Sequence, residues 1–162
     1  MTIAIGDKLP DGSFLEKGDE GIAPVALGDL VQGRRVVIFA VPGAYTGVCS
    51  TQHVPSFIRV AEQLRAKDVD AIVCVSVNDP HVLRAWSEAT GAGAAGIRML
   101  ADADGAFTRA LGLDFDNPAG GLYGRSKRYA MLVEDGIVRV LNVEASTGQC
   151  EVSAGETMLA AA

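Results

Sequence analysis

Two near-continuous apolar runs constrain the fold of this chain more than any other feature of its sequence. Residues 35–41 read Arg-Val-Val-Ile-Phe-Ala-Val, and residues 70–78 read Asp-Ala-Ile-Val-Cys-Val-Ser-Val-Asn. Runs that are rich in β-branched residues and lack polar alternation are typical of strands covered on both faces, as in the parallel sheets of α/β proteins. We therefore expect both runs to form buried strands, the first of them a central one.

Helical and strand patterns alternate around these runs. Apolar residues recur at three- and four-residue spacing over 54–66, which predicts an amphipathic helix. Asp79 and Pro80 suit the start of a second helix, since proline is favoured at the first helical position. A short strand is expected at 97–101, and a brief helix from Asp104-Gly105 to Leu111.

The C-terminal third contains the strongest short-range signal. The dipeptide Asp135-Gly136 separates two β-rich runs, 127–134 and 137–143, and such a dipeptide predicts a hairpin. Ser153, followed three residues later by Glu156, resembles a capping box that opens a last helix. This order predicts α/β layers with a mixed central sheet flanked by helices, as in the thioredoxin-like fold. A length of 162 residues suits one domain over residues 1–162.

Composition excludes several classes of function. A net charge of -6 argues against a nucleic acid or an anionic membrane as partner, because both require a basic face. No secretory signal and no apolar segment of about 20 residues is visible, which predicts a soluble, cytoplasmic protein. His53, His81 and three scattered cysteines give no ligand spacing, so we expect neither a metal nor a cofactor.

The cysteines indicate thiol chemistry rather than a disulfide scaffold. The chain has three cysteines, an odd number: Cys49, Cys74 and Cys150. None forms a C-x-x-C pair, which disfavours a thiol-disulfide oxidoreductase. Cys74 lies between two valines in an expected strand and is predicted to be buried. Cys49 follows a polar loop, residues 42–48, between a strand and a helix, where backbone N–H groups and the helix dipole stabilise a thiolate.

Ionisation alone does not make a thiol a fast nucleophile. Lowering a thiol pKa from about 8.5 to within roughly 3.5–7.5 supplies about a tenfold gain in thiolate at neutral pH. Fast attack also requires a geometry that stabilises the charge developing on the departing atom. Thr46 has two interpretations, a plain N-cap or a hydroxyl that binds the substrate of the thiol, and the alternative for Cys49 is a small buried apolar residue.

The motif Pro42-x-x-x-Thr46-x-x-Cys49 resembles the active-site motif of peroxiredoxins. The flanking residues 42–55, together with 75–79, 100–102, 126–129 and 142–144, resemble the type-5 branch, also called type II or atypical, over nearly the whole chain. The resemblance implies that Cys49 attacks the terminal peroxide oxygen, that Thr46 binds the peroxide and that Pro42 shields the pocket from water. It also implies that Arg128 holds the thiolate ionised. Without the resemblance, Arg128 would be interpreted as a solvated charge on a strand.

Two further positions near Cys49 matter for the resemblance. His53 matches a histidine of the branch that orients the arginine, the alternative being a histidine on the helix surface. Relatives usually carry proline directly after the motif threonine, but here Gly47 follows, and then Val48. Glycine relaxes a φ that proline would fix, so we expect a first helical turn that unwinds more easily after oxidation.

The resemblance does not determine how the sulfenic acid of Cys49 is reduced back to the thiol. Members resolve the sulfenic acid with a second cysteine, for which Cys150 is the candidate, or with glutathione, glutaredoxin or thioredoxin. Their substrates are hydrogen peroxide and organic hydroperoxides. The branch also implies a homodimer, with Tyr45, Phe107 and Leu113 as candidate contacts. The rival class is a thioredoxin-like redox sensor or chaperone module, which would not need Pro42, Thr46, Cys49 and Arg128 together.

Overall fold

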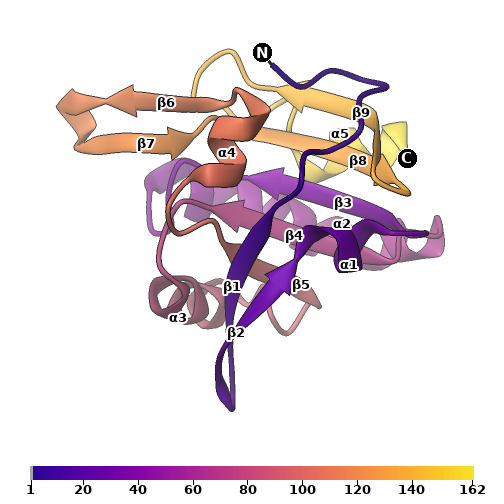
Figure 1. Cartoon of the computed structure of the whole chain (residues 1–162), viewed down its shortest axis with the longest axis horizontal. Coiled ribbons are helices and arrows are strands. Elements are labelled where there is room, and N and C mark those ends of the chain that lie inside the picture. Colours follow the sequence, from indigo (N-terminus) through magenta and orange to yellow (C-terminus); the bar gives the residue numbers. More distant parts are fainter. Residues whose placement is uncertain (1) are drawn as a thin grey trace.

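The computed structural model describes residues 2–162, with the side chain of Cys49 left outside the description. Within that range a seven-stranded mixed sheet has the order β2-β1-β5-β4-β3-β8-β9 (Figure 1). β3, β4 and β5 are parallel, and β8 continues the sheet antiparallel to β3. The strands of this sheet are β1 (Ser13–Gly18), β2 (Gly21–Ala26), β3 (Arg35–Ala40), β4 (Ala71–Ser76), β5 (Ile97–Ala101), β8 (Tyr129–Glu134) and β9 (Ile137–Val143).

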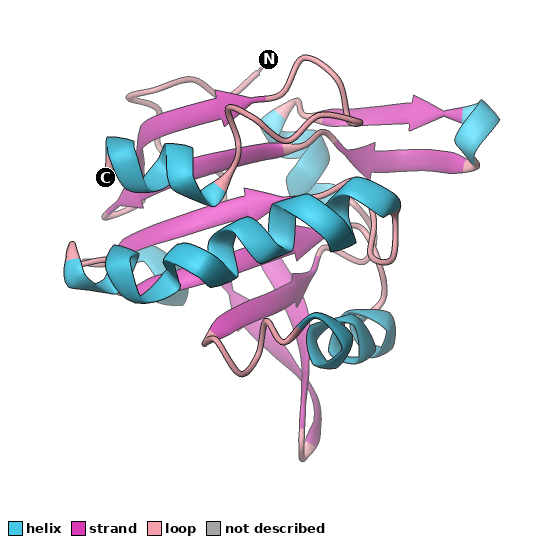
Figure 2. Cartoon of the chain, turned by 180° about the vertical axis from the view of Figure 1, so that it is seen from behind, coloured by secondary structure: helices cyan, strands magenta, loops and turns pink. Residues whose placement is uncertain are grey.

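The central strand β3 is buried on both faces, as its unbroken apolar run predicts. Val37 and Phe39 belong to one core cluster, whereas Val36 and Ile38 belong to the other, because successive side chains alternate across the sheet. The first cluster lies against α2 (Val54–Ala66), α3 (Pro80–Thr90) and α5 (Gly155–Ala161), and the second against α1 (Leu27–Val31) and α4 (Ala106–Leu111). Figure 2 shows α2 and α5 together on one face of the sheet. The predicted α/β thioredoxin-like architecture is confirmed.

Several predicted local signals are confirmed. Asp135 and Gly136 both have positive φ, 48° and 78°, as a tight two-residue hairpin between β8 and β9 requires. Asp79 caps α3 by accepting a hydrogen bond from the backbone N–H of Val82 at 2.9 Å. The sequence ranges expected for α2 and β5 match the structure at both ends.

The predicted capping box at the last helix is wrong. The N-cap of α5 is Ala154, with no side-chain hydrogen bond. Ser153 directs its hydroxyl away from the helix and donates to Glu144 at 2.5 Å, while Glu156 is exposed and pairs with Arg59. The Ser153 hydroxyl therefore donates to the buried carboxylate of Glu144 instead of capping the helix to which the sequence pattern assigned it.

Two antiparallel pairs lie outside the sequence prediction. The hairpin of β1 and β2 forms one edge of the main sheet. The second pair, β6 (Asp114–Asn117) and β7 (Leu122–Ser126), is joined by a 3-10 turn over Pro118–Gly120 and extends from the sheet as an arm (Figure 1). Among residues 2–162 no helix has the length and apolar character needed to cross a bilayer.

Candidate active site

The helix after β3 begins earlier than its apolar periodicity suggests. Helical backbone starts at Gly47, widens into a π-turn over Cys49–His53 and continues as α2. Pro55 accounts for the widening, because its ring lacks an N–H and clashes with the carbonyl four residues earlier in a regular α-helix. The backbone of Cys49 therefore lies in the first helical turn, as predicted, while the prediction about its thiol falls outside the described atoms.

Sheet register brings Arg128 to the same edge. Tyr129 pairs with Ala40, the last residue of β3, so Arg128 is adjacent to the start of the loop at Val41 and Pro42. Arg128 is only 2% exposed, whereas its neighbour Lys127 is exposed. The interpretation of Arg128 as a solvated strand charge is thus wrong, and the loop between β7 and β8, rather than a strand, carries it.

A buried histidine contacts this arginine. Nδ1 of His53 lies 3.0 Å from Nη1 of Arg128, and Nε2 of His53 lies 3.0 Å from the carbonyl oxygen of Ser153. Since a guanidinium only donates, Nδ1 accepts, and the proton on Nε2 is donated to Ser153. The arginine also donates from Nε to the carbonyl of Thr147 at 3.1 Å. His53 is fully buried and does not lie on the helix surface.

The environment of His53 keeps its imidazole neutral. Burial and the charge of Arg128 lower the pKa of His53 to about 3, and the hydrogen bond to Ser153 opposes this shift without cancelling it. A histidine with such a pKa does not serve as a base or a proton donor near pH 7. Its neutral Nδ1 instead fixes one face of the guanidinium.

A single carboxylate organises the segment that supplies both carbonyls. Oε2 of Glu144 accepts hydrogen bonds from the N–H of Glu151 at 2.8 Å, from the N–H of Ser153 at 2.7 Å and from the Ser153 hydroxyl. Burial raises the pKa of Glu144, but these donors outweigh it and leave the pKa below its ordinary value. We call Glu144, Thr147 and Ser153 the C-terminal clamp, because they fasten residues 144–153 to Arg128 and His53.

Other polar contacts hold the loop of residues 42–48. The hydroxyl of Thr46 donates to the carbonyl of Gly43 at 2.8 Å, and Oδ1 of Asn78 accepts from the N–H of Ala44 at 3.0 Å. Trp86 donates from Nε1 to the Ser50 hydroxyl at 2.9 Å, which fastens the π-turn to α3. Pro42 is buried within the loop.

Gly47 and Val48 open the helical run. Gly47 is exposed, and a Cβ at this position would meet no heavy atom within 4 Å, so space alone does not require glycine here. Its carbonyl accepts from the hydroxyl of Thr51 at 2.7 Å. Val48 is half-buried.

The remaining cysteines differ from each other. Cys74 is fully buried in β4 between Phe39 and Met99 on the neighbouring strands, which confirms the prediction of burial. Cys150 is half-buried within the clamped segment. Burial raises the pKa of its thiol, the charge of Arg128 lowers it and that of Glu144 raises it, leaving the pKa above the ordinary value.

Sequence reasoning misjudged two contacts and missed several site residues. Phe107 and Leu113 are each 2% exposed and belong to the core, so neither is available as a dimer contact, whereas Tyr45 is 57% exposed. Asn78 and Glu144 lie in segments that carry the resemblance, and the sequence pattern assigned Ser153 to a helix cap. No spacing in the sequence connects these three residues to the site, because they contact it only through the sheet register and the C-terminal fold.

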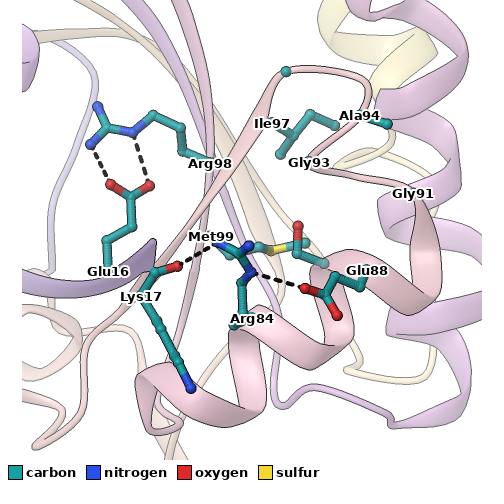
Figure 3. A pocket seen from close by; sticks show the side chains of 12 residues that line it. Glu16, Lys17, Arg84, Glu88, Gly91, Gly93, Ala94, Ile97, Arg98 and Met99 are labelled. Carbon is teal, nitrogen blue, oxygen red and sulfur yellow. Dashed lines mark hydrogen bonds and ion pairs between the residues drawn. The ribbon is translucent and has the colours of Figure 1, made fainter. Parts of the chain in front are cut away.

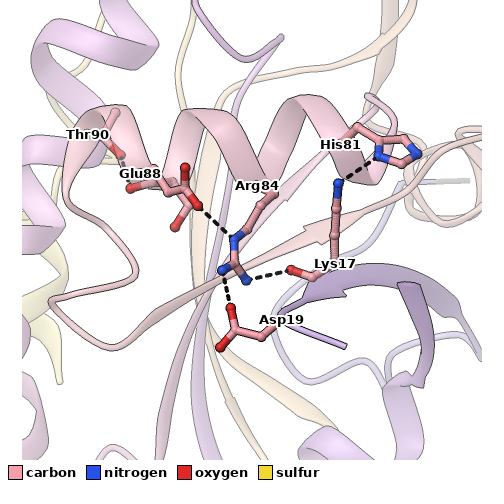
Figure 4. Close-up of polar contacts among 7 residues, drawn as sticks. Lys17, Asp19, His81, Arg84, Glu88 and Thr90 are labelled. Atoms are coloured by element: carbon pink, nitrogen blue, oxygen red, sulfur yellow. Dashed lines mark hydrogen bonds and ion pairs between the residues drawn. The ribbon is translucent and has the colours of Figure 1, made fainter. Parts of the chain in front are cut away.

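A surface pocket of about 560 Å³ lies away from these groups, between α3, β1 and β5 (Figure 3). Its charges satisfy one another, since Arg98 pairs with Glu16 and Arg84 with Glu88. Arg84 also pairs with Asp19 and donates to the carbonyl of Lys17 (Figure 4). Among the side chains that the structure describes, those of residues 2–48 and 50–162, no cluster of metal-ligating groups is found.

Comparisons with known proteins agree with this arrangement. The Redoxin family model matches residues 4–159. The chain is 45% identical to peroxiredoxin-2C of Oryza sativa, covering 98% of each sequence. It superposes on the crystal structure of reduced Prx3 of Vibrio vulnificus in complex with hydrogen peroxide with a TM-score of 0.93 at 48% identity, covering 99% of both chains. Peroxiredoxin 5 of Alvinella pompejana superposes with a TM-score of 0.83 at 32% identity, covering 98% of this chain and 96% of that one. The chain therefore belongs to the Redoxin family as a type II, peroxiredoxin-5-like peroxiredoxin, a thiol-dependent peroxidase.

Proposed function

We propose that Cys49 is the peroxidatic residue and that it reduces hydrogen peroxide and organic hydroperoxides. The Cys49 thiolate attacks the terminal peroxide oxygen, and the O–O bond breaks. The departing oxygen takes up a proton and leaves as water or an alcohol. Cys49 loses two electrons and becomes a sulfenic acid, while the peroxide is reduced.

The observation that carries the proposal is the buried pair of Arg128 and His53 beside the loop. Arg128 is desolvated and fixed by Thr147 and His53, so its charge acts in a medium of low polarity. A fixed guanidinium there favours the thiolate before the attack and the negative oxygen that leaves during it. Thr46 binds the peroxide, and Pro42 keeps water from the thiolate. His53, Gly47 and Val48 act through position rather than through proton transfer.

The role of Arg128 is tested by Arg128→Lys, which keeps the charge but loses the planar fork. Removing one preorganised donor typically lowers catalysis by about a hundredfold or more, and we expect a loss of that order in the second-order rate constant for peroxide. The matched control is Lys127→Gln, which removes an exposed charge at the next residue. Equal rates for Arg128→Lys and wild type would contradict the proposal.

For the return to thiol we propose an external reductant, glutathione with glutaredoxin or thioredoxin. A raised thiol pKa leaves Cys150 protonated near neutral pH, and the C-terminal clamp restrains its backbone. The second route is an intramolecular Cys49–Cys150 disulfide, which the proximity of Cys150 to the Arg128 charge favours. Disulfide geometry requires Cα atoms within about 7 Å, so this route needs the clamp or the first helical turn to open.

The two routes are distinguished by mass spectrometry and turnover. Wild type treated with peroxide and then with glutathione should carry a glutathione adduct on Cys49, and Cys150→Ser should turn over with glutathione and glutaredoxin as fast as wild type. A Cys49–Cys150 disulfide, together with loss of turnover in Cys150→Ser, would establish the intramolecular route instead. The same turnover assay, repeated with thioredoxin in place of glutathione and glutaredoxin, identifies the preferred reductant.

We further propose a homodimer of single-domain chains located in the cytoplasm, with Tyr45 among the contacts. The exposed ring of Tyr45 on the loop supports this, with its centroid 6.5 Å from that of Trp86. Light scattering of wild type and Tyr45→Ala measures the assembly, and a monomeric wild type would contradict it.

A further inference from the structure

A second arginine reaches the loop that precedes Cys49. Arg125 projects from β7, the inner strand of the arm, and its guanidinium packs on Gly43. A Cβ on Gly43 would lie 2.9 Å from Nη1 of Arg125, 3.4 Å from Cγ2 of Thr46 and 4.0 Å from Oδ1 of Asn78. The absence of a side chain at Gly43 is therefore what allows the guanidinium to lie against the loop. Arg125 and Thr46 therefore both lie against the backbone of Gly43.

Arg125 differs from the other arginines of the chain in its partners. Each of the others has a hydrogen bond or an ion pair to a protein acceptor. Among the described atoms of residues 2–162, which exclude the side chain of Cys49, no acceptor is bonded to Arg125, although its side chain is half-buried and the chain carries a net charge of -6. A partly desolvated guanidinium with no internal acceptor gains from binding an anion.

The geometry points to a carboxylate subsite beside the loop of residues 42–48: we propose that Arg125 binds the carboxylate of a reactant while the reacting atom of that reactant contacts Cys49. The inference rests on the proposed function of Cys49. A guanidinium offers two parallel N–H groups that match a carboxylate. Hydrogen peroxide is neutral and gains nothing from this site, whereas glutathione carries two carboxylates and some organic hydroperoxides carry one.

With glutathione the chemical step is balanced as follows. The thiolate sulfur of glutathione attacks the sulfenic sulfur of Cys49, an S–S bond forms and the S–O bond breaks. The oxygen leaves with the hydrogen of the sulfenic acid, takes up one proton from solvent and becomes water, and glutathione and Cys49 end as a mixed disulfide. Arg125 takes no part in the electron transfer; it raises the local concentration and fixes the orientation of the thiol.

The test compares wild type, Arg125→Gln and Arg125→Lys, with Lys127→Gln as the control that removes one exposed charge two residues away. Each protein is oxidised to the sulfenic acid with one equivalent of hydrogen peroxide and mixed with glutathione or with glutathione diethyl ester. We expect wild type and Lys127→Gln to prefer glutathione over the diester by about tenfold, the size of one charge-assisted hydrogen bond. Arg125→Gln should lose this preference, and Arg125→Lys should keep part of it.

A second arm uses cumene hydroperoxide with and without a ring carboxylate, and it shows whether the carboxylate comes from the thiol or from the peroxide. If Arg125→Gln loses only the preference for the carboxylated cumene hydroperoxide, the subsite binds the peroxide rather than the thiol. Equal losses for charged and neutral reactants in Arg125→Gln, or no preference in wild type, would overturn the proposal. So would dissociation of a dimer by Arg125→Gln with unchanged preferences, since Arg125 would then bind the partner chain.

Direct binding separates this inference from the proposed function. Cys49→Ser protein is titrated with S-methylglutathione, which cannot react, and the amide shifts of residues 43–47 are followed by NMR. Binding that weakens about tenfold on adding Arg125→Gln supports the subsite whether or not Cys49 is peroxidatic. Failure of wild type to consume peroxide would remove the proposed function alone.

Discussion

Replacing His53 by glutamine should change how the stability of the protein depends on pH. The neutral, buried imidazole accepts from Arg128 and donates to Ser153. A glutamine side chain offers an acceptor oxygen and a donor NH₂ group but does not titrate. The substitution therefore removes the proton equilibrium while keeping both kinds of contact.

The magnitude follows from the two pKa values of His53. In the unfolded chain the pKa is 6.5, and in the folded protein it is about 3. Below pH 6.5 the unfolded state binds a proton that the folded state does not, so the free energy of unfolding falls as pH falls toward 3. This group alone removes about 2 kcal/mol between pH 7.5 and pH 5.0, at ~1.4 kcal/mol per fully developed pH unit.

The assay is urea denaturation of reduced wild type, His53→Gln and His81→Gln at both pH values and one protein concentration. His81 is the other histidine of the chain and is exposed on α3, so its variant should follow wild type. The stability of His53→Gln should fall by about 2 kcal/mol less than that of wild type. Parallel losses in all three proteins would refute the placement of a neutral imidazole against Arg128.

Three further changes test other parts of the structure. Glu144→Gln should lower the free energy of unfolding at pH 7 by about 2 kcal/mol, because a charged acceptor of three hydrogen bonds is lost. Urea denaturation measures the difference in stability between wild type and variant. This difference should narrow in acid, where the wild-type carboxylate is protonated. Gly155→Ala should destabilise by about 1–3 kcal/mol in the same assay, because its Cβ would clash with the carbonyl of Ser56, whereas Gly148→Ala, with no atom nearer than 3.8 Å, should not. Gly47→Pro should stiffen the first helical turn, slow recycling and favour over-oxidation, because the sulfenic acid stays beside Arg128; unchanged rates of sulfinic acid formation and of reduction by glutathione would contradict that role.

The elements that the sequence predicted are those whose periodicity reports burial. β3 and β4 are covered on both faces and read as unbroken apolar runs, and α2 reads as one apolar stripe. β2 is an exposed edge strand that reads Gly-Ile-Ala-Pro-Val-Ala; it was missed because Pro24 interrupts its apolar run and argues against a strand. β6 and β7 were missed because they are short and polar and bury little.

The site was predictable only where the chain is continuous. Residues 42–49 are contiguous and run from the loop into the first helical turn, and their spacing carries the motif. The position of Arg128 depends on the register of β8 against β3, and the clamp depends on a carboxylate at Glu144 that competes with a helix cap for Ser153. Neither contact leaves a periodic trace, because both join segments that are far apart in the sequence.

The central claim, that Cys49 is the peroxidatic residue, is tested most directly by stopped-flow oxidation of reduced protein with one equivalent of hydrogen peroxide. Thiolate formation and preorganised donors together predict a second-order rate constant roughly a thousandfold above that of a free thiol. Cys49→Ser should abolish the fast phase, and Cys150→Ser should keep it. A wild-type rate equal to that of a free thiol, or a fast phase that survives in Cys49→Ser, would contradict the claim.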